Sequence, residues 1–347
     1  MTLALMLTGC KAPGYKEALT KSRTLIREQL KLQNIPGLAI AVTVDGKTVW
    51  SEGFGLADRE QNVPVDPSNT RFRIASISKA LTAIGMGVLY ERGQLQPDSS
   101  IWHYLTDFPA KKYRPTVRQV AGHIGGIRHY RGNENESNVR YPTVASGLSI
   151  FRDDTLLCKP GTQYNYSSYG FNLLSAVMES AGHQDFLELM QQEVFAPMGM
   201  NHTIADHVDS VITGRGRYYL RNGKNAPSVD NSYKWAGGGF LSTANDLAAF
   251  GNGLLRNKVI KSETLKLFTA SQTLDDGTQT GYGMGFGTGK DPAGRNRFGH
   301  SGGAVGGSSN LVIYPDSKMV VVILTNVSGA DVSMITDQVA EFFHGTH

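Results

Sequence analysis

Hydrophobic and polar residues alternate near both ends of the chain in the pattern of paired β-strands. Residues 37–55 read GLAIAVTVDGKTVWSEGFG, with two strand-like runs around Asp45–Gly46, a dipeptide typical of tight hairpin turns. Residues 311–314 and 319–324 repeat this pattern around Pro315–Asp316. We expect the two hairpins, which come from opposite ends of the chain, to share one antiparallel sheet.

Elsewhere the hydrophobic residues recur at intervals of three and four, which predicts amphipathic helices. The predicted helical segments are residues 15–32, 78–92, 169–181, 184–192 and 331–343. The expected fold class is therefore α+β, an antiparallel sheet flanked by helices and built from both chain ends, with a helix-rich part inserted between them. We expect one catalytic domain, residues 11–347, with its α/β part at about 15–75 and 280–347 and its helix-rich part at about 76–279.

Composition excludes several classes of function. The chain has 347 residues, of which 40% are hydrophobic, so it can bury a large core. Its net charge of +4 and the absence of any Lys/Arg run argue against nucleic acid as a partner. Cys10 and Cys158 are the only cysteines, too few for a disulfide framework or a cysteine-rich zinc site. We expect no metal and no cofactor, and chemistry that uses Ser, Lys, His, Tyr or carboxylates.

The N-terminus is a short apolar run that ends in Leu7-Thr8-Gly9-Cys10. This ending is typical of a bacterial lipoprotein signal, which is cut before the cysteine so that the thiol can be lipidated. No later segment offers the roughly 18 apolar residues that a membrane span needs. Residues 1–10 are therefore predicted to be a signal, with Cys10 as the lipidation site and only membrane anchor. The expected location is the cell envelope, on its periplasmic side or at the cell surface.

Two serines are candidate nucleophiles, and the first is Ser301. It lies in Gly299-His300-Ser301-Gly302-Gly303, which matches the G-x-S-x-G spelling of a nucleophile elbow. An elbow requires a helix directly after the serine and a catalytic histidine later in the chain. The following residues, GGAVGGSSN, are too rich in glycine to begin a helix. The pattern therefore argues against Ser301 as the nucleophile.

The second candidate is Ser76, which with Lys79 spells S-x-x-K at the start of a predicted helix. This spacing places both side chains on one face of the first helical turn. The partial positive charge of a helix N-terminus favours a neutral lysine amine in a buried site, and such an amine can accept the serine proton. Alone, the motif favours the simpler interpretation, with Ser76 as a helix cap and Lys79 as a solvated residue of the first turn.

Two further segments make the sequence resemble the serine β-lactamases of class C and their esterase and peptidase relatives. The segment PGTQYNYSSYGFNLL resembles their second motif, with Tyr166-Ser167-Ser168 in the position of Y-x-N. The segment FGHSGGAVGGSS resembles the third, with His300-Ser301-Gly302 in the position of K-T-G. The motifs GIRHY and HSGGAVGGSS resemble in particular the mitochondrial β-lactamase-like group. The resemblance extends over nearly the whole chain after residue 10.

The resemblance implies a role for each motif. Ser76 would be the nucleophile, and its backbone N–H together with that of Gly303 would hold the oxyanion. Tyr166 would lie near Ser76 and Lys79, with a lowered pKa that lets it act as general base and then as acid, and either Lys79 or Tyr166 could be the base.

Substrate-binding residues also follow from this comparison. Ser168, His300, Ser301 and Gly302 would line the cleft, with Ser301 as a strand residue beside the nucleophile. In the family, the residues at the positions of Ser168 and His300 hold the amide and carboxylate groups of β-lactams. Ser168 has a shorter side chain than Asn, and His300 lacks the fixed charge of Lys.

The implied function is that of a metal-independent serine hydrolase that works through an acyl-enzyme on a D-alanyl peptide, a small ester or a β-lactam. Its partner would be a small-molecule or peptide substrate. The alternatives are a catalytically silent peptidoglycan- or peptide-binding protein of the same fold, and a scaffold for assembly. Retention of Ser76, Lys79 and Tyr166 together argues against the silent protein, and the oligomeric state is not predicted.

Overall fold

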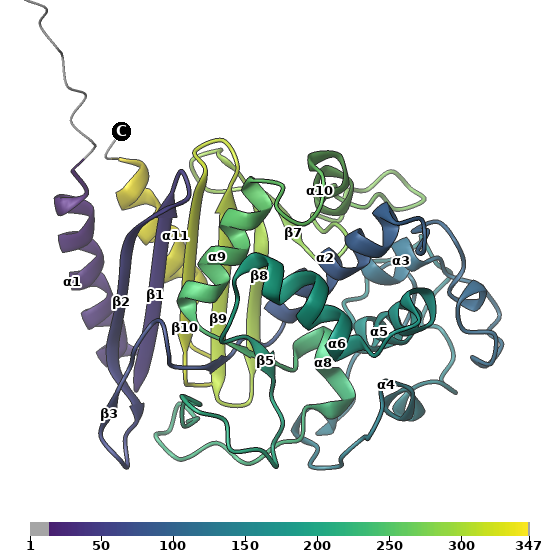
Figure 1. The fold of residues 1–347 in the computed structure, drawn as a ribbon, viewed down its shortest axis with the longest axis horizontal. Helices are drawn as coiled ribbons and strands as arrows, with labels where there is room; N and C mark the ends of the chain where they lie inside the picture. The colour runs from purple at the N-terminus through teal and green to yellow at the C-terminus, as the bar shows by residue number, and fades with distance from the viewer. Residues whose placement is uncertain (1–13, 346–347) are drawn as a thin grey trace, which may run out of the picture.

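The computed structural model describes residues 14–345 and contains two antiparallel sheets (Figure 1). The strands, in chain order, are β1 (Gly37–Val44), β2 (Lys47–Asp58), β3 (Val63–Pro64), β4 (Phe72–Arg73), β5 (Ile204–Ala205), β6 (Phe240–Ser242), β7 (Gly287–Lys290), β8 (Asn296–Ala304), β9 (Gly307–Tyr314) and β10 (Met319–Thr325). The seven-stranded sheet has the order β3-β2-β1-β10-β9-β8-β7, and the small sheet has the order β4-β6-β5. The predicted signal and Cys10 lie outside the described residues.

Most of the helices lie on one side of the large sheet, and the first and last helices lie on the other (Figure 1). The helices are α1 (Lys16–Leu32), α2 (Ile77–Glu91), α3 (Val117–Ala121), α4 (Val144–Gly147), α5 (Ser168–Gly182), α6 (Phe186–Met190), α7 (Ala196–Met198), α8 (Trp235–Gly238), α9 (Ala244–Leu255), α10 (Ser262–Thr269) and α11 (Val332–His344). A π-helical turn, Gln191–Phe195, follows α6. Within residues 14–345, no helix is both long and apolar enough to cross a membrane.

The two chain ends meet at the centre of the large sheet. Strand β1 pairs with β10 in antiparallel register from Leu38 opposite Thr325 to Val44 opposite Met319. The predicted joining of the two hairpins is confirmed, and so is the α+β class. Asp45 and Gly46 adopt φ angles of 49° and 73°, because the tight turn needs the left-handed region at both positions.

Strand β1 is buried on both faces, which explains its nearly continuous apolar sequence. Leu38 and Ile40 pack in the core that α1 and α11 form with one face of the sheet. Ala39 and Ala41 point the opposite way into the larger core, where α9 covers β1 and β10. Because side chains alternate along a strand, this one segment supplies both layers of the core.

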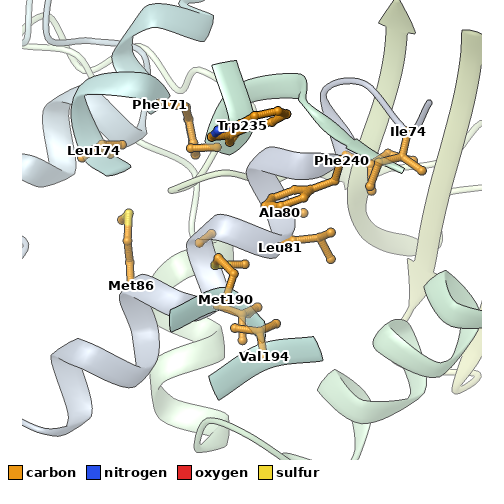
Figure 2. Close-up of a cluster of buried hydrophobic side chains, with 14 of the residues drawn as sticks. Ile74, Ala80, Leu81, Met86, Phe171, Leu174, Met190, Val194, Trp235 and Phe240 are labelled. Carbon is orange, nitrogen blue, oxygen red and sulfur yellow. The ribbon is translucent and has the colours of Figure 1, made fainter. Parts of the chain in front are cut away.

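Helix α2 runs through the middle of the helix-rich side and is surrounded by other elements. Every residue from Ile77 to Leu89 is buried. Figure 2 shows Phe171, Trp235 and Phe240, from α5, α8 and β6, packed around it. A helix that is apolar on all sides is stable only inside a core. The N-terminus of α2 is therefore held rigidly, and the site is built on it.

Candidate active site

Ser76 lies at the N-terminus of α2, directly after a strained turn. The preceding residue, Ala75, has a φ of 49°, in the left-handed region that costs a non-glycine residue about 1–2 kcal/mol. Strain of this kind concentrates at functional sites, where the surrounding structure enforces it. Here the hydroxyl of Ser309 on β9 donates to the carbonyl of Ile74 at 2.8 Å. The turn is thus fixed from the sheet side, and Ser76 is presented at the start of the helix.

Lys79 is fully buried one turn further along α2. Its Nζ lies 3.0 Å from Ser76 Oγ and 3.1 Å from Ser168 Oγ, and it donates to the carbonyl of Gly237. Burial holds the pKa of Lys79 well below its usual range, and the charge of Lys234 lowers it further. A neutral amine has two N–H groups and one lone pair, which matches these three partners when Ser76 donates its hydroxyl proton to the lone pair.

Tyr166 precedes α5 and lies over Lys79, whose Nζ is 4.8 Å from the centre of the tyrosine ring. Burial raises the pKa of Tyr166 above its usual range, and hydrogen bonding with Ser76 only partly offsets this. The expectation of a lowered pKa at Tyr166 is wrong, because loss of water disfavours the phenolate. Burial thus favours the neutral form of both groups near Ser76, an amine with a free lone pair at Lys79 and a protonated phenol at Tyr166.

Two histidines support the segment that carries Tyr166. The N–H of Asn165 donates to the carbonyl of His123 at 2.7 Å, and the N–H of Ser167 donates to His123 Nδ1 at 3.2 Å. The His123 ring also packs against Tyr166 with centroids 4.3 Å apart. His129 Nδ1 accepts from the N–H of Ser168 at 3.2 Å. No sequence motif identifies these two histidines as site residues, and the structure places them against the segment that carries Tyr166.

His123→Phe is expected to lower kcat about tenfold or more with little change in KM. Phenylalanine keeps a ring against Tyr166 but leaves the buried N–H of Ser167 without an acceptor, which costs about 1–3 kcal/mol. His123→Asn should restore most of kcat, because Asn offers an acceptor and tolerates the φ of 61° at this position. Steady-state kinetics with an aryl ester, beside thermal unfolding of both variants, measures this. Equal loss in both variants would show that His123 only stabilises the fold.

The third motif lies on β8, against the turn before Ser76. A Cβ at Gly302 would be 2.5 Å from the carbonyl oxygen of Ile74 and 2.9 Å from the Cβ of Ala75. Only glycine lets the strand approach so closely. The next residue, Gly303, faces open space. Its backbone and Ser76 line one cavity of about 80 Å³, which also includes Ser168.

His300 is held in the neutral form. Burial, the main cause, lowers its pKa to about 3, and a protonated Lys79 would act in the same direction; its Nε2 lies 2.8 Å from the hydroxyl of Tyr282. Ser301 is exposed on β8, and it lines a different cavity of about 300 Å³ beside His300. Strand β8 continues to Ala304, so no helix follows Ser301 and the elbow geometry is absent. The third motif thus supplies backbone and neutral groups, and no fixed positive charge.

Two arginines precede the third motif closely in the sequence, and both already have partners. Arg295 forms ion pairs with Asp291, at 2.6 Å, and with Glu341. Arg297 pairs with Asp337 on α11. Both guanidinium groups already have carboxylate partners on the protein, so neither is available to compensate for the neutral His300.

Lys234 is a site residue that the sequence motifs did not reveal. It ends the short helical turn Ser232–Lys234 and lines the cavity that contains Ser76 and Gly303. Its position next to Trp235-Ala236-Gly237, in an otherwise apolar run, was the one available signal. A lysine among apolar residues is expected to be buried. That it lies in the same cavity as Ser76 is a result of the tertiary fold and could not be predicted from this run.

The fold and this site together define a serine hydrolase. The chain belongs to the Beta-lactamase family, whose profile matches residues 23–344. The human serine beta-lactamase-like protein LACTB, mitochondrial, is 32% identical over 87% of this chain and 73% of its own length. A D-aminopeptidase of Brucella anthropi is 26% identical over 90% of this chain and 60% of its own.

Solved structures share the fold at low sequence identity. The octameric penicillin-binding protein homologue from Pyrococcus abyssi superposes with a TM-score of 0.83 at 24% identity, covering 94% of this chain and 77% of that one. A class C beta-lactamase superposes with a TM-score of 0.80 at 17% identity, covering 94% and 96%. At these identities the structures establish the architecture and leave the substrate open.

The comparisons correct the predicted location. The short apolar N-terminus suggested a bacterial cell envelope and an anchor at Cys10. The human and mouse relatives, which match 87% and 88% of this chain, are described as mitochondrial proteins. They overturn the cell-envelope prediction, which rested on ten residues that the structure does not describe.

Proposed function

We propose that this hydrolase forms an acyl-enzyme on Ser76, with Lys79 as the general base. The observation that carries the proposal is the contact between Ser76 Oγ and the fully buried Nζ of Lys79 at 3.0 Å. Ser76 Oγ attacks the acyl carbon of the substrate, and its proton moves to the lone pair of Lys79. The oxyanion is held by the N–H groups of Ser76 and Gly303.

Collapse of the tetrahedral intermediate breaks the bond to the leaving group. A protonated Tyr166 suits the role of proton donor to that group, because its raised pKa keeps the hydroxyl proton in place until it is needed. Lys79 then returns a proton to Tyr166, and water hydrolyses the acyl-enzyme. The family and the retained residues favour this enzyme over a silent binding protein.

The acyl-enzyme can be tested directly by mass spectrometry. Protein quenched in acid during turnover of p-nitrophenyl butyrate should carry one added butyryl group, located on the peptide that contains Ser76. Protein without substrate is the control. Hydrolysis of the ester with the adduct on another residue, or no hydrolysis at all, would contradict the proposal.

We further propose that short acyl esters are better substrates than penicillins and cephalosporins. The hydroxyl of Ser168 is engaged with Lys79 at 3.1 Å, so it is a poor partner for the amide of a β-lactam side chain. With a pKa of about 3, His300 carries no charge for the β-lactam carboxylate at neutral pH. Each lost contact to a charged group costs about 1.5–3 kcal/mol, or one to two decades in specificity.

The measurement is kcat/KM for p-nitrophenyl butyrate and for nitrocefin on one enzyme preparation. The ester should be favoured by at least tenfold. Ser301→Ala is the control variant, and it should change neither kcat/KM value strongly, because Ser301 lines a different cavity from Ser76. A higher kcat/KM for nitrocefin would show that carboxylate recognition has been rebuilt elsewhere in the site.

A further inference from the structure

Lys234 is a buried amine in the wall of the active-site cavity. Only 8% of the residue is exposed, and it lines the cavity together with Ser76, Ser168 and Gly303. Its Nζ donates to the backbone carbonyl of Asn135 at 3.0 Å. The proposed mechanism uses the amine of Lys79 and gives the amine of Lys234 no role.

Among residues 14–345, no carboxylate lies at ion-pair distance from Lys234. The two nearby acids are engaged elsewhere, since Asp206 pairs with Arg73 at 2.7 Å and Asp230 accepts from the N–H of Ser232 at 2.8 Å. The ring centres of Tyr233 and Tyr130 lie 5.0 and 5.5 Å from Nζ. Burial and the charge of Arg73 lower the pKa of Lys234 to about 7, while the charges of Asp206 and Asp230 act from a longer distance in the opposite direction.

A buried ammonium without a counter-ion is energetically costly, and proteins normally pair it. Lys234 has three donors, of which the Asn135 carbonyl occupies one. A carboxylate that enters the cavity would accept from the others and supply the missing charge. Such a pair would form in a confined space of about 80 Å³, where water screens it little.

The proposed mechanism assigns this cavity to the acyl portion of the substrate. Its lining contains the two N–H groups proposed to hold the oxyanion, from Ser76 and Gly303. Tyr166, the proposed donor to the leaving group, is not part of this lining and instead contacts His123 and His300. The leaving group therefore departs toward Tyr166, while the acyl chain extends toward Lys234.

We propose that Lys234 selects substrates whose acyl portion carries a carboxylate, by pairing with that carboxylate in the cavity beside Ser76. The inference rests on the proposed function, because it assigns the acyl side from the proposed oxyanion site. It also predicts discrimination against an acyl portion with a free amine, since a second cation would face Lys234 in the same space.

Three aryl esters of matched chain length test the specificity. They are the p-nitrophenyl esters of adipic acid, of its monomethyl ester and of 6-aminohexanoic acid, which place a carboxylate, a neutral ester or an ammonium at the same position. The native enzyme should favour the carboxylate over the neutral ester by about 10- to 100-fold in kcat/KM, and should disfavour the amine.

Lys234→Met should bring the ratio of carboxylate to neutral ester close to one, and Lys234→Arg should retain part of the preference. Lys224→Met is the matched control, because Lys224 is exposed and lies outside the cavity lining, and its ratio should equal that of the native enzyme. Thermal unfolding verifies that each variant is folded. An unchanged ratio in Lys234→Met, or a preference of the native enzyme for the amine, would overturn the inference.

Binding separates this inference from the proposed function. Adipate and the neutral adipamide are titrated calorimetrically into Ser76→Ala, with and without Lys234→Met. Binding of adipate that depends on Lys234 supports the anion site even if no ester is turned over, in which case the proposed function fails alone. Turnover of the esters without preference, together with no Lys234-dependent binding, leaves the proposed function intact and overturns the anion site.

Discussion

Ser76→Ala is expected to abolish covalent labelling by a fluorophosphonate probe and to lower ester turnover by about three to six orders of magnitude. The Ser76 hydroxyl is positioned 3.0 Å from the amine of Lys79, at the N-terminus of a helix that is buried along its length. The other two hydrogen-bond partners of that amine are a second hydroxyl, from Ser168, and the carbonyl of Gly237. Ser168 lies deeper in the structure and is only 3% exposed, so it cannot replace Ser76 as nucleophile.

Ser301→Ala is the matched control, because it removes the other serine with a nucleophile-like sequence context. Ser301 is exposed on a strand and lines a separate cavity, and within residues 14–345 its hydroxyl has no hydrogen bond to a lysine. Labelling and turnover should remain measurable in this variant. Intact-mass and peptide spectra of the native protein complete the comparison, and an adduct located on Ser301 would refute the assignment.

Lys79→Arg is expected to reduce kcat by several orders of magnitude while the protein stays folded. A lysine amine can be neutral when buried, whereas a guanidinium remains charged and has no lone pair to accept a proton. Arg is also larger than the enclosed space between Ser168 and Gly237, so Lys79→Met is the second variant, with similar length and no amine. Turnover of an aryl ester and thermal unfolding of both variants are the measurements. Near-native activity in either variant would refute the neutral-amine mechanism.

The pH profile tests the same assignment without relying on one substitution. A base with a lowered pKa is neutral above that pKa and gains a proton below it, so kcat/KM of the native enzyme should fall on the acid side and stay high as pH rises. Lys79 interacts with Lys234, whose pKa is about 7, so the acid limb describes the coupled pair. In Lys79→Met, the pH profile of the residual kcat/KM should no longer show the fall on the acid side that protonation of the Lys79 amine causes.

Much of the fold could be predicted from local patterns. The helix expected over 78–92 is observed at Ile77–Glu91, and the one expected over 169–181 at Ser168–Gly182. The hairpin at Asp45–Gly46 forms as expected, because its turn conformation is encoded by two neighbouring residues. The predicted helix boundaries agree less well with the structure where the regular α-helical hydrogen bonding is interrupted. The segment 184–192 divides into α6 and a π-helical turn, which periodicity alone does not distinguish.

The motif residues were identifiable because each motif is short and its chemistry is local. The spacing of Ser76 and Lys79 places them one turn apart on any helix, and the absence of a helix after Ser301 could be inferred from its glycines. The protonation state of Tyr166 could not be predicted, because its pKa depends on burial by distant segments. The location was predicted wrongly because it rested on a short terminal pattern with no tertiary support.

The sequence by itself determined the class of fold, the family and the candidate nucleophile, since these depend on periodicity and on residues close together in the chain. Only the tertiary structure decided which groups surround Ser76 and in which charge state. Lys234 and Gly303 reach the same cavity from segments about 70 residues apart, and His123 contacts the segment of Tyr166 from about 40 residues away. Burial then sets the pKa of each group, because the cost of charge depends on which side chains exclude water, and those side chains come from the whole chain.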